Sequence, residues 1–436
     1  MSNIKLDEVT RVHFIGVGGI GMSALARFFL HEGKVVSGSD RASSAITEAL
    51  SSEGVEFTPK QSPDNITDDI DLVVYTEGVN EKTEGYGELM AAREKEIETI
   101  NYFTALGLVV NPYYLIAVAG THGKTTTTAM LADVLEEASF DPSVVVGSLR
   151  TKTRSNYRAG KSKYFVVEAC EYKRDFLRLE PDILVITNIE LDHVDYYQDL
   201  ADVQNAFRTL AKKVPADGFI IADVSNPNVK PVLEGVEATV IDYRTFVDLG
   251  ISLHQPGLHN RLNAAAASAT ASTLEIEKAV SDKALENFAG TWRRFEYKGE
   301  VNGIKVYDDY AHHPTEIAAA IGGSKELYPD KSLMVVFQSH TYTRTSELFD
   351  DFVTALAKAD RVILLPIYAA REENVSGVSS GKLAEAIMEI GGQAKVVVNP
   401  EEGVELAKKI TPENGVIITM GAGDMTSKVA EGLVNK

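Results

Sequence analysis

The stretch Ala117–Ala129, AVAGTHGKTTTTA, decides how this chain is interpreted. The apolar run before it, Tyr113–Ile116, predicts a short buried strand, and the threonines near its end predict the start of a helix. Small residues between strand and helix let backbone N–H groups surround a phosphate, and the helix N-terminus adds a favourable dipole. Lys124 is placed to reach the β- and γ-phosphates of a nucleotide, and the Thr125 hydroxyl to bind Mg²⁺. The sequence therefore predicts a nucleoside triphosphate site.

This loop departs from the general pattern GxxxxGK(S/T), because Val118 stands where the first glycine is expected. The alternative is a glycine-containing turn between strand and helix that binds no phosphate. The strand–loop–helix setting favours the phosphate loop. The residues expected around the phosphates are Gly120, Thr121, His122, Gly123, Lys124, Thr125 and Thr126.

The overall composition is that of a globular protein of several domains and argues against nucleic-acid binding. The 436 residues suffice for about three domains of ~150 residues each. Apolar residues make up 44% and charged residues 24%, which are ordinary values for a globular protein. The net charge of −20 argues against a nucleic-acid surface, which would be basic. We therefore expect no nucleic-acid partner.

Cysteine usage and hydropathy predict a soluble, cytoplasmic protein. Cys170 is the only cysteine, so no disulfide can form within the chain, as is usual in a reducing compartment. No apolar run reaches the ~18 residues of a membrane helix, and the first residues, MSNIKLDEVT, lack the order of a signal peptide. We expect no membrane insertion, and a monomer or a weak homo-oligomer.

A second glycine loop lies in the first third of the chain. Arg11–Gly16 predicts a buried strand, glycines then lead into a helix that ends at about His31, and Asp40 follows the next predicted strand. This is the layout of a dinucleotide-binding unit, with Asp40 placed for a ribose hydroxyl. Alone it would suggest an NAD enzyme. A glycine pattern, however, reports phosphate binding and not hydride transfer.

Two charged segments are assigned no chemistry. Glu88–Glu98 predicts a helix with a solvated face, and Arg150–Ser162 predicts an exposed loop or hairpin.

Polar residues follow two further strands predicted in the middle of the chain. Lys163–Val167 leads to Glu168, and Asp182–Thr187 leads to a segment that ends at His193. Ligands bind beyond the carboxyl ends of parallel strands, so both clusters should face the phosphate loop. Carboxylate oxygens suit Mg²⁺, which makes Glu168 a candidate ligand. His193 could bind a second metal or orient a neighbour, and the alternative is that these acids only cap helices.

The last third repeats the pattern of strands that end in polar residues. Apolar runs predict a second α/β unit with a mostly parallel sheet, over 304–307, 333–337, 362–365, 395–398 and 416–419. His312 follows the first of these runs and His340 the second, which favours function over packing. Upstream, His259, Asn260 and Asn263 could recognise an adenine edge.

Ten ordered segments resemble the ATP-dependent Mur ligases of peptidoglycan synthesis, over essentially the whole chain. They are HFIGVGGIGMSALA, VSGSD, AGTHGKTTTT, EACEY, TNIELDH, GLHNRLNAAAA, GTWRRFE, DDYAHHPTEI, FQSHTYTRT and GAGDM. Within the family, the segments match the members that join L-alanine to UDP-N-acetylmuramate. Members that re-attach recycled tripeptide differ mainly at the first glycine loop, which is bulkier there than Gly16–Ser23. A non-ligating oxidoreductase or regulatory protein remains the alternative of another class.

The resemblance implies an α/β fold of three domains. Residues 1–112 would form a Rossmann-like domain for the UDP-sugar, 113–293 a central P-loop ATPase-like domain with a mostly parallel sheet, and 294–436 a C-terminal Rossmann-like domain for the amino acid. A UDP-sugar in the first domain replaces the NAD interpretation. The residues implied for it are Gly16, Gly18, Gly19, Gly21, Met22, Ser23, Ser39 and Asp40.

The resemblance also implies the reaction. ATP would phosphorylate the lactyl carboxylate of UDP-N-acetylmuramate, and the amine of L-alanine would attack the acyl phosphate, through a tetrahedral intermediate that expels phosphate. Catalysis is then positioning plus charge stabilisation. Lys124 and Mg²⁺ would neutralise the transferring phosphoryl group. Thr125 and Glu168 would hold one Mg²⁺, and His193 a second.

Further residues are implied for the adenosine and the amino acid. The adenosine would lie near His259, Asn260, Asn263, Arg294 and Asp308, with Asp309 as the alternative to Asp308. The amino acid would lie near Tyr310, His312, His340 and Arg344, of which His312 and Arg344 would take part in catalysis. The family often has Pro-His-Arg where this chain has Ser339-His340-Thr341, so Arg344 would carry more of the carboxylate recognition. L-alanine against glycine or L-serine, and the base that deprotonates the amine, stay open.

In several relatives that add later amino acids, a lysine on the helix after the Asp-His pair is carbamylated. The position aligned with it here is Arg208, on a helix expected over Asp199–Val214. An arginine stays protonated and cannot carry a carbamate. We expect Arg208 to point away or to pair with a carboxylate.

Overall fold

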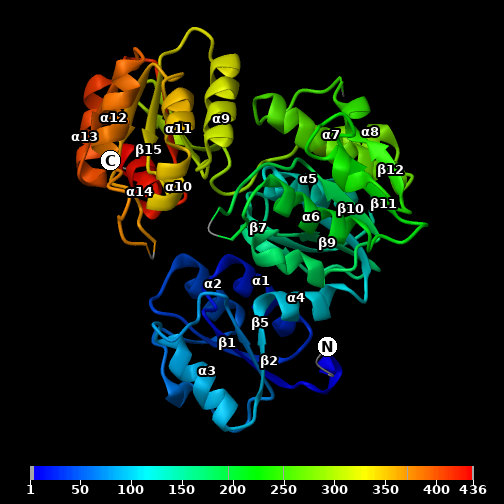
Figure 1. Ribbon diagram of the computed structural model, residues 1–436. Coiled ribbons are helices and arrows are strands. Elements are labelled where there is room, and N and C mark those ends of the chain that lie inside the picture. The colour runs from blue at the N-terminus through cyan, green and yellow to red at the C-terminus, as the bar shows by residue number, and fades with distance from the viewer. Residues whose placement is uncertain (1–3, 195, 249, 371, 435–436) are drawn as a thin grey trace. The chain divides into compact units, whose positions relative to one another are not determined.

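The computed structural model describes residues 4–194, 196–248, 250–370 and 372–434. Its strands form three sheets, of five, seven and six strands in chain order, each with helices beside it (Figure 1). The chain divides into two compact units, of which the first holds the five- and seven-stranded sheets and the second holds the six-stranded sheet. The expected α/β fold with three mostly parallel sheets is confirmed, while the domain borders at 112 and 293 stay predictions.

The first sheet is entirely parallel and has the order β3-β2-β1-β4-β5. Its strands are β1 (Arg11–Ile15), β2 (Val35–Ser39), β3 (Glu56–Thr58), β4 (Leu72–Tyr75) and β5 (Glu98–Asn101). Its helices are α1 (Ile20–His31), α2 (Ala45–Glu53), α3 (Gly85–Glu94) and α4 (Tyr102–Val110). The central strand β1 leads directly into the glycine loop, which therefore lies at the middle of the sheet's carboxyl edge.

The second sheet has the order β12-β11-β10-β6-β9-β7-β8 and is parallel except for the β7–β8 hairpin. Its strands are β6 (Tyr114–Ala119), β7 (Ser143–Arg150), β8 (Ser155–Arg158), β9 (Tyr164–Glu168), β10 (Ile183–Ile186), β11 (Phe219–Ala222) and β12 (Thr239–Asp242). The helices of this part of the chain are α5 (Lys124–Glu137), α6 (Leu200–Ala211), α7 (Leu258–Thr273) and α8 (Lys278–Glu286). Because β6 lies between β9 and β10, both polar clusters flank the phosphate loop.

The third sheet has the order β13-β14-β18-β15-β16-β17. Its strands are β13 (Glu296–Val301), β14 (Ile304–Asp309), β15 (Leu333–Phe337), β16 (Arg361–Leu364), β17 (Ala394–Val396) and β18 (Val416–Met420). Its helices are α9 (Pro314–Leu327), α10 (Tyr342–Glu347), α11 (Phe349–Leu356), α12 (Ser380–Glu389), α13 (Pro400–Ile410) and α14 (Asp424–Val434). The antiparallel edge strand β13 was not predicted, because its sequence EYKGEV is polar and only partly buried.

Short 3₁₀ helices complete the chain: η1 (Leu6–Glu8), η2 (Pro63–Asn65), η3 (Tyr172–Arg178), η4 (Lys230–Leu233) and η5 (Tyr243–Phe246). Among the described residues, no helix combines the length and the apolar character that a crossing of the bilayer requires.

Continuous apolar runs form the central strands because helices cover both faces of a parallel sheet. All four residues of β10, ILVI, are completely buried. The same holds for Leu115–Ala119 of β6. The central strands therefore belong to the hydrophobic core, and the polar residues gather in the loops beyond the carboxyl ends of these strands.

The solvated face expected over Glu88–Glu98 is wrong at its first residue. Glu88 is completely buried and accepts hydrogen bonds from Ser39 Oγ (2.5 Å), Asn65 Nδ2 (2.5 Å) and the Ser62 backbone N–H (3.0 Å). Burial raises the pKa of Glu88, but the surrounding donors outweigh it and hold the pKa below its usual value. The expected helix is present only up to Glu94, where α3 ends, and Glu98 begins β5. A run of charges also does not show which charge points inward.

The segment Arg150–Ser162 forms the β7–β8 hairpin, as expected, but it is not simply exposed. Arg150 is 3% exposed and pairs with Asp133 and, at 2.6 Å, with Glu136 of α5. Asn156 is completely buried: its amide donates to Ser23 Oγ (2.9 Å) and to the Ile20 carbonyl of α1. The hairpin therefore joins the first and second sheets of the first unit.

Candidate active site

The phosphate loop runs from the end of β6 to the start of α5 and packs directly on the loop after β10. Gly120 has φ 136° and Gly123 has φ 83°, conformations that side-chain-bearing residues rarely adopt. A Cβ atom on Gly120 would lie 2.0 Å from Thr187 Oγ1. Glycine at 120 is therefore required both by the backbone conformation and by this close approach.

Hydrogen bonds hold the phosphate loop in one conformation. The His122 N–H donates to Asn188 Oδ1 (2.9 Å), and the His122 carbonyl accepts from Thr187 Oγ1 (2.6 Å) and Asn188 Nδ2 (3.0 Å). The Thr121 hydroxyl accepts from the Glu190 N–H (2.9 Å). A loop held in this way at a helix N-terminus is a preorganised anion site. The expectation that the cluster after β10 faces the loop is confirmed.

Lys124 is the first residue of α5 and is nearly buried beside Glu171. Its ammonium nitrogen lies 2.9 Å from a Glu171 carboxylate oxygen and donates to the carbonyls of Gly120 (2.5 Å) and Thr121 (3.0 Å). Burial lowers the pKa of Lys124, but the Glu171 carboxylate outweighs it and raises the pKa above its usual value. Lys124 is therefore a permanent positive charge at the phosphate loop.

Thr125 and Glu168 present oxygen atoms to each other beside this charge. Thr125 Oγ1 donates to Glu168 Oε1 (3.0 Å), while Glu168 Oε2 accepts from the Gly147 N–H (2.7 Å). A hydroxyl and a carboxylate at this separation are the oxygen donors that Mg²⁺ prefers, with water and phosphate oxygens completing the shell. The pair therefore fits the ion expected there. Burial raises the pKa of the nearby Cys170 thiol to about 12, which disfavours a nucleophilic role.

The first glycine loop is supported by Ser39, the last residue of β2, and by Asp40, which follows it. The N–H groups of Gly16 and Val17 donate to the Ser39 carbonyl (2.8 and 3.0 Å), and the Gly18 N–H donates to Asp40 Oδ2 (2.9 Å). Asp40 therefore contacts the loop itself, which places it beside any phosphate or ribose bound there.

The remaining residues predicted for this loop lie at the start of α1. Met22 and Ser23 are buried within the helix and support the loop from inside. Gly19 is the residue before the helix. A Cβ on Gly21 would lie 2.6 Å from the Tyr102 hydroxyl, so this glycine leaves room for a tyrosine that the sequence alone did not single out. Burial, followed by the charge of Glu168, raises the pKa of Tyr102, so it stays a neutral donor.

The residues predicted around adenine meet at the start of α7, in the second unit. Asn260 Nδ2 bonds the Pro256 carbonyl (2.8 Å) and lies 3.1 Å from His259 Nε2, while Asn263 Nδ2 donates to Asn260 Oδ1 (3.3 Å). Burial lowers the pKa of His259 to about 4, so the ring is neutral at physiological pH. One connected set of neutral amide and imidazole groups suits the edge of a base.

Asp308 and Asp309, at the end of β14, are both engaged within the second unit. Asp308 is 1% exposed, and its carboxylate accepts from Arg293 Nε (3.0 Å), Thr419 Oγ1 (2.7 Å) and Ser427 Oγ (2.8 Å). The structure thus gives Asp308 a structural part, as the buried counter-ion of Arg293. The place of Asp308, or of Asp309, near the ribose stays a prediction.

Asp309 accepts from two backbone N–H groups, those of Phe295 (2.8 Å) and Ala311 (2.7 Å). Burial raises the pKa of Asp309 to about 6, against the opposing charge of Arg294. The Arg294 guanidinium lies 5.2 Å above the Tyr310 ring. This contact keeps Arg294 beside the residues predicted for the amino acid.

The four residues predicted for the amino acid form one chain of contacts beyond β14 and β15. The rings of Tyr310 and His312 have centroids 5.4 Å apart, and those of His312 and His340 are 6.3 Å apart. Arg344 Nη1 donates to the His340 carbonyl (3.1 Å). The His340 ring stacks on Tyr368 at 5.3 Å, a partner that sequence reasoning missed because it follows β16, far along the chain. The sheet order brings these segments together.

His193 belongs to the second unit and has φ 53°, a conformation uncommon for a histidine. Its part as a second-metal ligand stays a prediction. Two residues close to the loops escaped the sequence analysis as site residues: Glu171, the partner of Lys124, and Asn188, the partner of His122. Both stand in the polar segments after β9 and β10, which is the signal that could have identified them.

Three family models match successive parts of the chain. They are described as the Mur ligase family, catalytic domain, at residues 11–114; the Mur ligase middle domain, at 118–245; and the Mur ligase, glutamate ligase domain, at 293–423. Together these segments cover all three sheets.

Full-length relatives agree with this match. The chain is 41% identical to a UDP-N-acetylmuramate–L-alanine ligase of Clostridium novyi, over 97% of each chain, and 39% identical to one of Lachnospira eligens, over all of both. A solved UDP-N-acetylmuramate–alanine ligase of Thermotoga maritima superposes with a TM-score of 0.80 at 28% identity, over 97% of this chain and 98% of that one. A murein peptide ligase of Psychrobacter arcticus (24% identity, TM-score 0.71, covering 98% and 99%) shares the fold. The chain belongs to the Mur ligase family.

Proposed function

We propose that this protein is an ATP-dependent ligase that joins L-alanine to UDP-N-acetylmuramate in peptidoglycan precursor synthesis. The observation that carries the proposal is the phosphate loop, which holds Lys124 beside the Thr125–Glu168 oxygen pair. The full-length similarity to UDP-N-acetylmuramate–L-alanine ligases supports the choice of substrates. The cytoplasm is the compartment we infer for it, and a monomer or weak homo-oligomer its state.

The first step transfers the γ-phosphoryl group of ATP to the lactyl carboxylate. The bond between the γ-phosphorus and the β–γ bridging oxygen breaks, and a carboxylate oxygen forms the new bond to phosphorus. Lys124 balances the negative charge of the transferring group, and the loop N–H groups orient it. Mg²⁺, when bound by Thr125 and Glu168, supplies further charge neutralisation.

The second step joins the amine to the activated carbonyl carbon. The nitrogen attacks this carbon, a tetrahedral intermediate forms, and the carbon–oxygen bond to phosphate then breaks. Arg344 holds the α-carboxylate of the amino acid, because a guanidinium matches its two oxygens. His312, whose Nδ1 lies 3.0 Å from the Tyr310 carbonyl, orients the amine. The attacking amine gives up a proton in this step, and this proton is released to solvent with the expelled phosphate.

The adenosine is assigned to the neutral set at the start of α7, namely His259, Asn260 and Asn263, together with Arg294. The domain borders are proposed at 112 and 293, and the matched segments are 11–114, 118–245 and 293–423. The UDP-sugar is assigned to the loop from Gly16 to Ser23, with Ser39 and Asp40. His193 is retained as the proposed second-metal residue.

Phosphate release with defined substrate sets tests this function. We expect release only when ATP, UDP-N-acetylmuramate and L-alanine are all present, because chemistry awaits closure around all three substrates. Steady release with ATP alone, at the full ligation rate, would contradict the proposal. Replacing L-alanine with glycine or L-serine should lower kcat/KM. Faster turnover with a tripeptide than with L-alanine would instead indicate a recycling ligase.

A further inference from the structure

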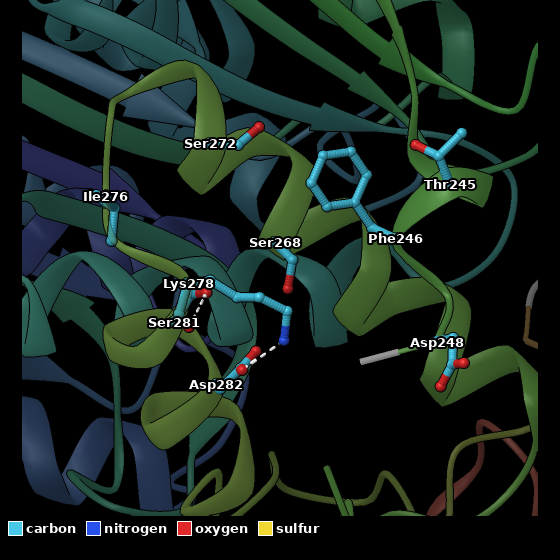
Figure 2. A pocket seen from close by; sticks show the side chains of 9 residues that line it. All are labelled: Thr245, Phe246, Asp248, Ser268, Ser272, Ile276, Lys278, Ser281 and Asp282. Atoms are coloured by element: carbon cyan, nitrogen blue, oxygen red, sulfur yellow. Dashed lines mark hydrogen bonds and ion pairs between the residues drawn. The ribbon is translucent and has the colours of Figure 1, made fainter. Parts of the chain in front are cut away.

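A cavity lies at the edge of the seven-stranded sheet, away from the phosphate loop. It has a volume of about 290 Å³ and is enclosed by η5, which follows β12, by the second half of α7 and by the start of α8 (Figure 2). The sheet order separates β12 from β6 by three strand spacings, or ~14 Å. The volume is at the small end of the ~300–1,000 Å³ typical of ligand pockets. The cavity is therefore a separate site of small-molecule size.

The floor of this cavity carries two buried polar atoms that the protein does not satisfy. Ser268 is 6% exposed, and its hydroxyl, which points into the cavity in Figure 2, has no hydrogen-bond partner among the described residues. Asp282 Oδ1 is likewise buried without such a partner. Leaving buried polar groups unpaired is unfavourable, because they have lost their hydrogen bonds to water. Both atoms are thus placed to receive a ligand.

The three other hydroxyl side chains of the cavity offer acceptors, because their hydrogens are already engaged. The hydroxyls of Thr245, Ser272 and Ser281 donate their only hydrogens to the backbone carbonyls of Asp242 (2.8 Å), Ala269 (2.7 Å) and Lys278 (2.9 Å). Only lone pairs of these hydroxyls remain for a ligand.

The charges of the cavity lining also favour a ligand that donates hydrogen bonds. The Lys278 ammonium bonds Asp282 Oδ2 at 2.5 Å, so its charge is already balanced within the cavity wall. Asp248 stands at the exposed rim and adds a further negative charge. The lining as a whole carries one excess negative charge. A donor-rich, positively charged group complements it.

Two apolar side chains complete the wall. Phe246 and Ile276 also line the cavity, and the Phe246 ring offers a surface to a cation as well as to methylene groups. A bare inorganic ion would bury no apolar surface against these side chains. A neutral polyol would bring acceptors for which this cavity has few donors. An aliphatic ammonium matches the acceptors, the charge and the apolar wall together.

We propose that this cavity binds a small aliphatic amine, whose ammonium group contacts Asp282 Oδ1 and Ser268 Oγ and whose methylene groups pack on Phe246 and Ile276. The site differs from the amino-acid site proposed above, because it lies on η5, α7 and α8 and holds no arginine for a carboxylate.

Calorimetric titration of the full-length protein with butane-1,4-diamine tests this inference. ADP and L-alanine are kept at saturating concentration, so that the catalytic sites are occupied. We expect one equivalent of diamine to bind, and the neutral isostere butane-1,4-diol to bind about tenfold more weakly or less, equivalent to ~1.4 kcal/mol. Loss of diamine binding in the presence of L-alanine would overturn the inference, as would equal affinity for the diol.

Matched variants localise the binding. Asp282→Asn should weaken diamine binding about tenfold, because it removes the negative charge, and Ser268→Ala roughly threefold to tenfold, because it removes the unsatisfied hydroxyl. Ser272 lines the same cavity, but its hydroxyl already donates to a carbonyl of its own helix. Ser272→Ala should therefore leave the affinity within about twofold.

Glu286→Gln controls for charge, because it makes the same change as Asp282→Asn at an exposed position of α8 outside the cavity. Its affinity should equal that of the unaltered protein. Thermal unfolding of every variant confirms its fold, and if Asp282→Asn is unfolded, Ser268→Ala decides. Unchanged affinity in Ser268→Ala, or an equal loss in Glu286→Gln, would refute the site.

Discussion

The ammonium of Lys124 and the carboxylate of Glu171 form an ion pair at the phosphate loop, with nitrogen and oxygen 2.9 Å apart. The side chains are 13% and 2% exposed, so water screens the pair poorly. A nucleotide phosphate and Glu171 would compete for the same ammonium. We therefore expect the strength of nucleotide binding to depend on Glu171 as well as on Lys124.

Replacing Glu171 with glutamine should strengthen binding of a non-hydrolysable ATP analogue by roughly threefold to tenfold, because the competing charge is removed.

Lys124→Ala should lower kcat by about a thousandfold through loss of phosphoryl stabilisation. Calorimetry should show unchanged UDP-N-acetylmuramate binding in both variants, since the sugar nucleotide is assigned to the first sheet. Loss of sugar binding in a folded Lys124→Ala protein would contradict that assignment.

Glu168→Gln should raise the Mg²⁺ concentration for half-maximal activity about tenfold, because a neutral amide binds a hard cation poorly. The measurement is the phosphate-release rate as a function of Mg²⁺ concentration, after removal of bound metal with a chelator. Glu137→Gln, an exposed change at the end of α5, is the matched control and should leave the curve unchanged. An unaltered Mg²⁺ dependence in Glu168→Gln would exclude the carboxylate as a ligand.

Arg344→Ala should raise KM for L-alanine about tenfold to a hundredfold, while KM for ATP and for the UDP-sugar stays within about twofold. The reason is that a carboxylate is best held by a planar guanidinium. Arg344→Lys should recover only part of the loss, because an ammonium is a point charge. Equal increases for all three substrates would point to a defect of folding or domain closure.

Asp309 should make the second unit less stable as pH rises from about 4 to about 6. Burial raises the pKa of this carboxyl from 3.8 to about 6, so in that interval the native state binds more protons than the unfolded state. Stability attributable to Asp309 is therefore present below pH 4 and lost through pH 6, by ~3 kcal/mol.

The comparison with Asp309→Asn isolates this effect from other acids. Chemical denaturation from pH 4 to 8 should show the unaltered protein losing stability relative to the variant up to about pH 6, with no further change above pH 7. Asp330→Asn, at an exposed position, should run parallel to the unaltered protein. A constant difference across the whole range would show that Asp309 titrates normally.

Activity should not depend on dissolved bicarbonate. Arg208 of α6 donates to the Pro231 carbonyl (3.0 and 3.2 Å) and to Asn205 Oδ1 (3.3 Å), so it points to neighbouring amide groups and not to a carboxylate. An arginine cannot carry a carbamate. The assay follows rigorous removal of bicarbonate and its restoration. Recovery of activity on restoration would turn attention to Lys212 and Lys213.

Local sequence patterns sufficed to predict the three α/β units and the positions of their polar loops. Continuous apolar runs such as ILVI form strands that are buried on both faces, as in β10. Such a run can be recognised from residues that are adjacent in the sequence. Likewise Gly120, Gly123 and Lys124 form the predicted phosphate loop because a strand, a glycine turn and a helix N-terminus are adjacent along the chain. Spacing along the chain therefore suffices to predict the strand–loop–helix geometry, while nucleotide binding at this loop stays a proposal.

Only the tertiary structure decided which polar residues serve the site and which serve the fold. Asp308 and Asp309 look equivalent in sequence, yet Asp308 is the buried counter-ion of Arg293 and Asp309 holds two backbone N–H groups. Glu88 and Asn156, both in segments expected to face water, are completely buried. A charged or polar side chain can be buried wherever distant donors satisfy it, and those donors are brought near by strand order, which local sequence does not encode.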